Sequence, residues 1–283
     1  MNNISLLLGA GFSAPQGYPI GNQLNDFILK SNEDNFAFAP SGDLEVRTDG
    51  KKPDFGYKTI YDIEFEYCYQ LILHFKEING SFDYEEFYDY LTENINSDSN
   101  VSEIAKPFID DVTTIHLLTS GLKNVYIQVV AHYIKDKNGN SYYDNQPYLL
   151  DEHFLGYTGL LKSIKELSKK SILNIHTLNH DLFFESFNNT AFLEGNLSDG
   201  FEELGSIYYG KLTKDNRRNM VRLQRYTGNY YGNFRLYKLH GSLDYKLYYR
   251  NEKGQFLPEI YLKSKYGIGN TDLYKKIQNE KAN

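Results

Sequence analysis

The sequence predicts an α/β protein built on a parallel β-sheet, and three observations support this. Short apolar runs at residues 4–8, 171–178 and 234–239 are typical of buried parallel strands. Each run ends at glycine or small polar residues, which is where open parallel sheets hold their ligands. Helical periodicity fills most of the chain between the first two runs, far more than the dozen or so residues of a simple crossover. We therefore expect a Rossmann-like three-layer parallel sheet with a large helical insertion or subdomain.

The first apolar run ends in a glycine-rich turn made of Gly9, Ala10, Gly11, Phe12 and Ser13. Gly9 permits backbone angles that other residues avoid, and Gly11 lets an anion approach the main chain. With Ala14 the turn has the G-x-G-x-x-A spacing of dinucleotide-binding sites, in which a pyrophosphate sits on the N–H groups of a helix start. An ordinary tight turn gives the same pattern, so the rest of the chain must decide.

Helices are predicted for most of the chain between the first two runs. Apolar residues recur at helical spacing in residues 20–30, 61–78, 84–95, 102–134 and 154–169, with an interruption near Gly121. One helical turn at residues 13–16 would be capped by the Ser13 hydroxyl and stopped by Gly17. Residues 32–57 predict a loop or a small irregular insertion, and residues 136–140 predict a turn.

The later part of the chain repeats the order of strand, polar loop and helix, with a helix-like stretch at residues 182–187. Residues 194–232 form an excursion rich in glycine, asparagine and arginine. Its basic residues are expected to form a solvated helix face, with a local anion or partner patch as the alternative; they are Lys211, Lys214, Arg217, Arg218, Arg222 and Arg225. Residues 243–249 alternate like an edge strand, and a charged helical stretch is expected within residues 261–283.

Composition excludes several classes of protein. The 283 residues are 41% hydrophobic, which is enough for a core, and 30 basic against 37 acidic residues give a formal charge of −7. This charge argues against a broad nucleic-acid-binding face. No apolar run is long enough to span a membrane, and the start lacks a secretory signal, so we expect no membrane partner and a cytoplasmic location. Cys68 is the single cysteine, so neither a disulfide nor a cysteine-cluster zinc site can form within the chain.

The three strand ends carry the sequences Gly-Ala-Gly-Phe-Ser, Thr-Leu-Asn-His-Asp and Leu-His-Gly-Ser. Together and in this order, within residues 6–24, 175–185 and 237–243, they resemble the sirtuin-like domains of bacterial defence proteins that hydrolyse NAD. They resemble the sirtuin protein deacylases more distantly. The resemblance implies an NAD glycohydrolase that makes nicotinamide and ADP-ribose and drains NAD during phage infection, as in abortive infection. It also implies a homo-oligomer triggered by a sensor domain or a partner protein, such as a phage protein or a partner ATPase.

The resemblance also assigns roles to residues at the strand ends. An asparagine amide can donate and accept hydrogen bonds without bringing charge, so Asn179 would orient the ribose and the attacking water. His240 would take a proton from the ribose hydroxyls or from the water. Asp181 would accept a hydrogen bond from the nicotinamide amide or fix the loop. The N–H groups of the glycine-rich turn and the Ser13 hydroxyl would hold the diphosphate. The expected NAD-binding residues are Gly9, Ala10, Gly11, Phe12, Ser13, Asp181, Gly241 and Ser242.

Structural alternatives exist for the same residues. Asn179 and Asp181 are also typical caps of a helix beginning at Leu182, His240 could be a hydrogen-bonded histidine at a strand end, and Ser242 a turn residue. His176 and His180 are four residues apart, but the first lies in a predicted strand, so the spacing does not predict a metal site and no metal is expected. Histidines in or beside predicted helices are expected to be structural or exposed, and Cys68 to pack in the core; these histidines are His74, His116, His132 and His153.

The chain departs from the sirtuin deacylases in ways that bear on its activity. One cysteine cannot build their zinc ribbon, and the residues after Pro19 lack their Phe-Arg pair, so removal of acyl groups from lysine is disfavoured. Related domains also have a further strand end, which this chain lacks after Ser242. We expect a single domain over residues 1–283, with Rossmann-type parts at 1–31 and 170–262, an insertion at about 58–169, and a place in a longer chain or a multi-subunit system. ADP-ribosyl transfer or cyclisation, and a non-catalytic sensor that binds NAD or ADP-ribose, remain the alternatives.

Overall fold

Four parallel strands form the sheet that carries the candidate site. Their order is β1 (Asn2–Leu8), β4 (Ser171–Thr177), β10 (Phe234–Lys238) and β5 (Leu197–Ser198). The register aligns Leu8 and Lys238 with Thr177, so β1, β4 and β10 end at one edge of the sheet. The predicted α/β class with a parallel sheet is therefore confirmed, and the three apolar runs are strands. The expectation that the first run is buried is wrong, because β1 is an edge strand whose side chains are exposed or half-buried.

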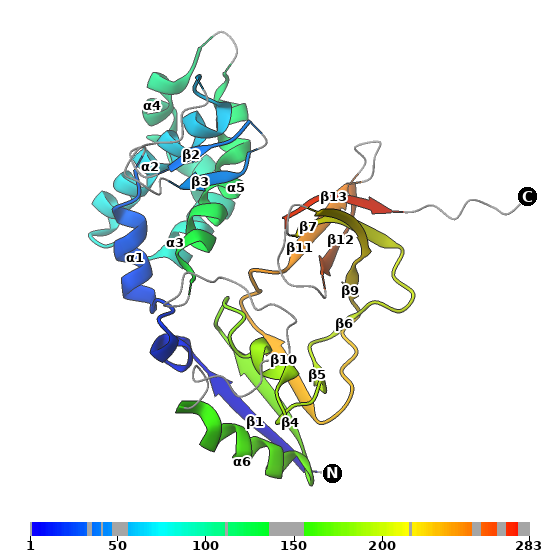
Figure 1. Ribbon diagram of the computed structural model, residues 1–283. Helices are drawn as coiled ribbons and strands as arrows, with labels where there is room; N and C mark the ends of the chain where they lie inside the picture. Colours follow the sequence, from blue (N-terminus) through cyan, green and yellow to red (C-terminus); the bar gives the residue numbers. More distant parts are fainter. Residues whose placement is uncertain are drawn as a thin grey trace, which may run out of the picture. The chain divides into compact units, whose positions relative to one another are not determined.

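The computed structural model describes residues 2–32, 36–40, 42–46, 56–110, 113–135, 156–214, 217–250, 256–264 and 270–276. The chain divides into two compact units (Figure 1). We call Met1–Tyr18 with Asp136–Asn283 the sheet unit, and Pro19–Lys135 the helical unit. The sequence placed the insertion at about 58–169. The division in the structure differs because α1 (Gly21–Leu29) packs on helices α3 and α5, whereas α6 (Thr158–Ser168) packs on strand β4.

One face of the parallel sheet is covered by α6, which lies beside β1 and β4 in Figure 1. Along β4, buried and half-buried side chains alternate, as expected for a strand with one covered face. Leu173 and Ile175 are fully buried on that face, and Leu161 of α6 is fully buried too. This packing fixes the strand ends that carry the polar loops.

The helical unit has a hydrophobic core of its own. Its remaining elements are β2 (Phe36–Phe38), β3 (Leu44–Val46), α2 (Ile60–Asn79), α3 (Tyr84–Asp89), α4 (Val101–Ala105) and α5 (Ile115–Tyr133). β2 and β3 pair as an antiparallel hairpin within the stretch predicted as a loop or irregular insertion. The hairpin packs on α2 and α5 through a buried cluster of Phe36, Phe38, Phe65, Val125 and Val129. Asp83 caps α3, accepting hydrogen bonds from two backbone N–H groups.

Helix α5 runs without interruption through Gly121, so the break predicted there is wrong. The glycine serves packing instead. A β-carbon at Gly121 would lie 2.0 Å from the carboxyl carbon of Glu64, which projects from α2. Burial raises the pKa of Glu64 to about 7, because the charged carboxylate loses its hydration.

Two antiparallel sheets complete the sheet unit. One has the order β11 (Lys246–Arg250), β12 (Phe256–Lys263), β9 (Gln224–Tyr226) and β6 (Phe201–Glu202), and the other β13 (Asn270–Lys276), β7 (Tyr208–Lys214) and β8 (Arg217–Arg222). A buried cluster of Tyr208, Leu223 and Leu262 packs within this region. The edge strand predicted at 243–249 corresponds to β11, at one end of its sheet.

Two helix predictions in this region are wrong. The basic residues between 211 and 225 lie on strands β7, β8 and β9, and the C-terminal stretch predicted to be helical contains strand β13. Leu223, between β8 and β9, is buried, while Arg222 and Arg225 are exposed. The basic residues were expected on a helix face, whereas this stretch forms antiparallel strands.

Short helical turns connect several elements. They are 3₁₀ turns at Ala10–Phe12, Ala14–Gln16, Ile95–Ser97, Lys106–Phe108 and Glu185–Asn189, and a π-helical turn at Tyr90–Asn94. The turn at 14–16 ends at Gly17, which has a left-handed φ of 95°. The predicted hydroxyl cap by Ser13 is wrong, because that hydroxyl makes no cap hydrogen bond. The helix-like stretch predicted at 182–187 is the short 3₁₀ turn at Glu185–Asn189.

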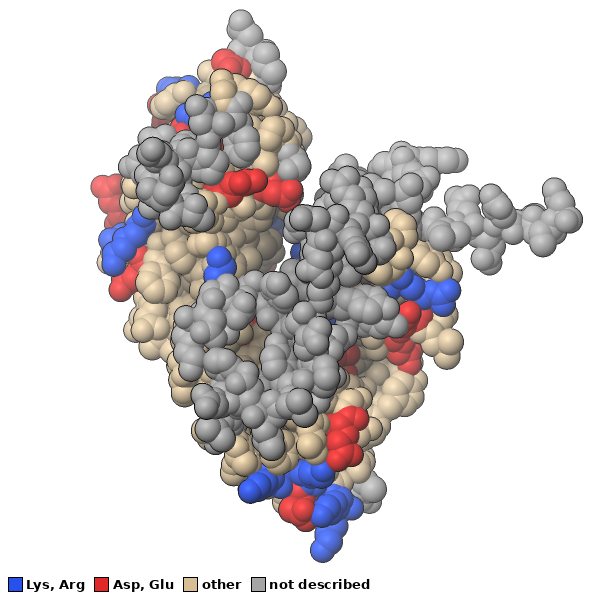
Figure 2. Space-filling model, viewed as in Figure 1, with Lys and Arg blue, Asp and Glu red and all other residues tan. Residues whose placement is uncertain are grey.

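Figure 2 shows both basic and acidic side chains on the surface of the molecule. Two exposed ion pairs involve α6, Lys165–Glu194 and Lys169–Glu166, each at 2.6 Å. No helix among the described residues is long and apolar enough to cross a membrane. The predicted turn at 136–140 and His153 lie outside the described residues.

Candidate functional site

Three loops follow the aligned ends of β1, β4 and β10 and are tied together by backbone hydrogen bonds. Leu178 N–H donates to the Leu8 carbonyl at 3.2 Å, and Leu239 N–H donates to the Thr177 carbonyl at 2.9 Å. Leu243 N–H donates to the His180 carbonyl at 3.1 Å. The glycine-rich turn, the Asn-His-Asp loop and the His-Gly-Ser loop therefore meet at one edge of the sheet, within the sheet unit.

The glycine-rich turn does not use the left-handed backbone that the sequence suggested. Gly9 has a φ of −108° and a ψ of −176°, which is extended backbone. The turn closes with Phe12 N–H donating to the Gly9 carbonyl at 2.8 Å. A β-carbon at Gly9 or Gly11 would meet nothing within 4 Å among the described residues. The glycines thus leave space beside the main chain, and the first N–H groups of the Ala10–Phe12 turn lack acceptors within that turn.

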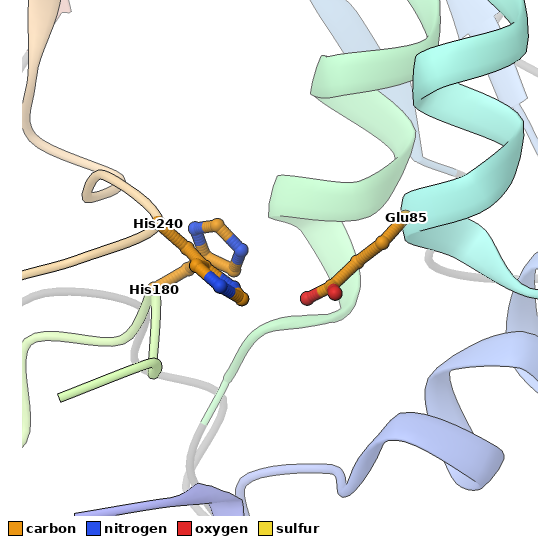
Figure 3. A group of neighbouring side chains, drawn as sticks. All are labelled: Glu85, His180 and His240. Carbon is orange, nitrogen blue, oxygen red and sulfur yellow. The ribbon is translucent and has the colours of Figure 1, made fainter. Parts of the chain in front are cut away.

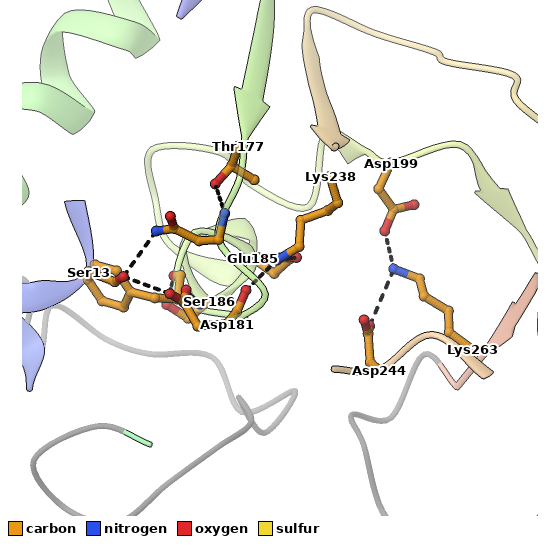
Figure 4. A network of polar contacts seen from close by, with 11 residues as sticks. Ser13, Thr177, Asp181, Glu185, Ser186, Asp199, Lys238, Asp244 and Lys263 are labelled. Atoms are coloured by element: carbon orange, nitrogen blue, oxygen red, sulfur yellow. Dashed lines mark hydrogen bonds and ion pairs between the residues drawn. The ribbon is translucent and has the colours of Figure 1, made fainter. Parts of the chain in front are cut away.

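Asn179, Ser13 and Asp181 form a hydrogen-bonded chain between two of the loops (Figure 4). The Asn179 amide Nδ2 donates to the Gly9 carbonyl and to Ser13 Oγ, both at 3.1 Å. Ser13 Oγ in turn donates to Asp181 Oδ2 at 2.6 Å. Ser13 and Asp181 are 1% and 6% exposed, so the hydrogen bond between them is shielded from water, while Asn179 is half-buried.

These contacts distinguish the roles of the two polar residues in the Asn-His-Asp loop. Asp181 Oδ1 accepts from Phe183 N–H at 3.0 Å while Oδ2 accepts from Ser13, which corresponds to the loop-fixing role. Asn179 is not the N-cap of the helical turn that follows, Glu185–Asn189, which begins after Phe184. Both Asn179 amide protons are directed at the glycine-rich turn. Its Oδ1 is the atom that can accept a hydrogen bond from a ligand hydroxyl or a water.

The His-Gly-Ser loop brings His240 to the same edge of the sheet. His240 is exposed, and its ring centroid lies 6.1 Å from that of His180. Figure 3 draws both rings. Glu85, also drawn there, belongs to the helical unit. Gly241 has a φ of 86°, which favours glycine at this turn. Ser242 Oγ is buried without a hydrogen-bond partner among the described residues.

The described imidazoles of the sheet unit do not form a metal site. His176 lies on β4 and stacks on Tyr237 at 4.8 Å between ring centroids, whereas His180 lies in the following loop. His180 and His240 are two ligands, and a structural or catalytic zinc site uses at least three protein ligands.

An aromatic cluster that the sequence did not predict supports the glycine-rich turn. The Phe12 ring lies 5.2–6.2 Å from the rings of four residues, measured between centroids; they are Tyr157, Phe183, Phe184 and Phe187. The Tyr157 hydroxyl also donates to the Phe12 carbonyl. The sequence does contain a signal for this cluster. The phenylalanines at 183, 184 and 187 have the spacing that places side chains on one side of a helical turn. Phe12 therefore anchors the turn.

The sequence also did not predict that two lysine side chains are buried, those of Lys238 and Lys263. Lys238 Nζ lies 3.1 Å from Glu185 Oε1 and donates to the Asp181 carbonyl, and its side chain is 1% exposed. Lys263 pairs with Asp199 and lies 3.8 Å from Asp244 Oδ2. Burial raises the pKa of Glu185 to about 7, against the opposing effect of Lys238.

The remaining predictions for single residues concern the helical unit. Cys68 is buried in α2, as expected, and burial raises the pKa of its thiol, which disfavours the reactive thiolate. His74 of α2 pairs with Asp98 at 3.0 Å, while His116 is exposed on α5. His132, also on α5, is half-buried against Phe36, and burial lowers its pKa to about 4. Each contact is structural.

The chain matches no known protein family and no curated protein.

Proposed function

We propose that this chain is an NAD glycohydrolase that cleaves NAD to nicotinamide and ADP-ribose. The observation that carries the proposal is the Asn179–Ser13–Asp181 chain, which joins the Asn-His-Asp loop to the glycine-rich turn. His240 follows the next strand at the same edge. An amide, an imidazole and a glycine-rich turn on neighbouring strand ends are the parts that binding a dinucleotide and cleaving its glycosidic bond require.

The reaction needs orientation more than strong acid. When the bond between ribose C1′ and the nicotinamide nitrogen breaks, its electron pair leaves with neutral nicotinamide and positive charge develops on the ribose. A water oxygen then bonds to C1′ and gives up a proton. NAD and water thus yield nicotinamide, ADP-ribose and one proton.

Each residue group has a place in this reaction. Asn179 Oδ1 accepts a hydrogen bond from the ribose or the attacking water, with the amide held by Gly9 and Ser13. His240 accepts the proton released by the water. The N–H groups of Ala10 and Gly11 donate to the diphosphate, since a helical turn leaves its first N–H groups without internal acceptors.

The wider setting of the activity belongs to the same proposal. We assign the chain to the sirtuin-like effectors of anti-phage defence, with a Rossmann-like three-layer sheet, an inserted helical subdomain and a cytoplasmic site of action. It would act as a homo-oligomer, and a sensor domain or partner protein would trigger NAD depletion.

The test is incubation of the purified full chain with NAD, followed by chromatography of the products. Wild type should release nicotinamide and ADP-ribose, and Asn179→Ala and His240→Ala should each lower turnover by about 100-fold or more while remaining folded. Matched controls are Asn22→Ala and His116→Ala, which alter exposed residues of the helical unit and should keep full turnover. Undiminished NAD loss in both site variants would refute the assignment.

The products also separate the alternatives. Cyclic ADP-ribose, or ADP-ribose attached to protein, would identify a cyclase or a transferase that uses the same first step. Tight binding of NAD that stays intact after long incubation, with and without candidate triggers, would identify a sensor module instead.

A further inference from the structure

The buried ammonium group of Lys238 contacts the loop that carries Asn179. Lys238 lies two residues before His240 in the sequence. Its Nζ donates to the Asp181 carbonyl and lies 3.1 Å from Glu185 Oε1 (Figure 4). The Lys238 side chain is 1% exposed and the Glu185 side chain 5% exposed. Lysine is almost never buried to this degree unless it is paired, and here the partner is Glu185.

The contacts of Lys238 connect two of the three loops of the candidate site. Lys238 ends β10 and leads into the His-Gly-Ser loop, whereas the Asp181 carbonyl belongs to the Asn-His-Asp loop after β4. Two backbone bonds join these loops, from Leu239 N–H to the Thr177 carbonyl at their bases and from Leu243 N–H to the His180 carbonyl farther out. The Lys238 side chain adds a third contact, at the residue whose carboxylate holds Ser13.

We propose that Lys238 is a positioning residue that holds the Asn-His-Asp loop against the His-Gly-Ser loop, and so sets Asn179 relative to His240. Glu185 is the ion-pair partner of Lys238, at 3.1 Å. Lys238 itself touches no substrate. The inference deepens the proposed function and rests on it where turnover is concerned, but the ordering of the loop can be measured without NAD.

The second buried lysine provides a matched control. Lys263 has a 6% exposed side chain and pairs with the carboxylates of Asp199 and Asp244. Lys263 is thus a lysine of similar burial and pairing on a different strand, β12. Replacing either lysine by methionine removes a buried charge and keeps the length of the side chain.

The experiment compares three full-length variants: Lys238→Met, Lys263→Met and the double variant Lys238→Met with Glu185→Gln. Hydrogen exchange measured by mass spectrometry should show that Lys238→Met speeds exchange in residues 178–184 by about tenfold or more, and Lys263→Met should not. For NAD turnover, kcat should fall about 10- to 100-fold in Lys238→Met with KM changed less than about threefold, as expected for misplaced reacting groups.

The double variant distinguishes a positioning role of Lys238 from a role in compensating the buried charge of Glu185. Removing the Glu185 charge should restore thermal stability, because no uncompensated carboxylate remains, but neither the slow exchange of residues 178–184 nor kcat should return. The inference is overturned if Lys238→Met exchanges at this loop like Lys263→Met, or if the double variant recovers both properties. If wild type leaves NAD intact, the proposed function fails while the exchange comparison still decides whether Lys238 orders the loop.

Discussion

The Ser13 hydroxyl shows how one side chain can connect distant parts of a sequence. It accepts from the Asn179 amide and donates to the Asp181 carboxylate, so it satisfies two polar groups from a loop more than 160 positions away in the sequence. Ser13 is 1% exposed and its bond to Asp181 is buried, so water cannot replace the hydroxyl at that carboxylate if the hydroxyl is lost. The serine is therefore a structural requirement of the site, beside any contact it makes with a diphosphate.

Ser13→Ala should destabilise the protein by about 1–3 kcal/mol, because it leaves a buried carboxylate oxygen and an amide proton without partners. Denaturant unfolding measures this. The matched control is Ser163→Ala in α6, where an exposed hydroxyl donates to the Gly159 carbonyl at 2.9 Å within the same helix. The control should change stability by less than about 0.5 kcal/mol. Equal effects of the two substitutions would contradict the buried chain.

Among the secondary-structure elements, the packing of α2 against α5 depends on the absence of a side chain at Gly121. Gly121 gives the Glu64 carboxyl group room against α5. A glycine inside a helix normally costs about 1 kcal/mol relative to alanine. The close approach of Glu64 favours glycine at this position. The helix continues through it because a cost of about 1 kcal/mol does not end a helix of 19 residues.

Gly121→Ala should therefore destabilise the protein, by about 1–3 kcal/mol, although alanine is the better helix former. The control is Gly159→Ala in α6, where a β-carbon meets nothing within 4 Å, and which should stabilise by up to about 1 kcal/mol. Thermal melts of both variants make the comparison. Adding Glu64→Ala to Gly121→Ala should relieve the clash; a stabilised Gly121→Ala would show that the helices are not packed this closely.

The strands of the parallel sheet were predictable because their signal is local. β1, β4 and β10 are short apolar runs stopped by residues that do not continue a strand, such as Gly9 and Asn179. The same signal predicted which loops meet at the sheet edge. Strands β7 to β9 were missed because lysine and arginine recur throughout this stretch, so no apolar run marks it as strand.

The finer parts of the site were not predictable, because they depend on contacts between residues distant in sequence. No local pattern indicates that Lys238 is buried, since a lysine at a strand end is ordinarily exposed. The use of both Asn179 amide protons by the glycine-rich turn also follows only from the folded arrangement. The sequence thus predicted which residues gather, and the structure indicates which atoms remain for a ligand.

For the chain as a whole, the division into two units has a consequence for folding. The helical unit is one continuous segment, residues 19–135, with a buried aromatic core. Phe87 is 0% exposed, and its ring lies near those of Phe75, Phe82, Tyr90 and Tyr126. A segment of this size with its own core meets the requirements of an independent domain.

Residues 19–135 produced alone should give a helical circular dichroism spectrum and a cooperative thermal transition. Phe87→Ala in the same segment should cost about 3–5 kcal/mol and remove or strongly lower that transition. A segment that melts without cooperativity, or that is indifferent to the substitution, would show that the helical unit depends on the rest of the chain.

The pairing of β1 with β4 sets a waiting time during translation. Asn2 pairs with Ser171, so β1 leaves the ribosome long before its only neighbouring strand in the described sheet is made. At bacterial or eukaryotic elongation rates this interval is roughly 10–30 s. During this interval β1 has no strand to pair with, and the apolar side chains of Ile4, Leu6 and Leu8 remain unpacked. The helical unit, which follows β1 in the sequence, can already fold. Chaperones that bind nascent chains therefore have a defined target at residues 2–8, and slowed elongation should reduce the yield of native protein without changing its stability.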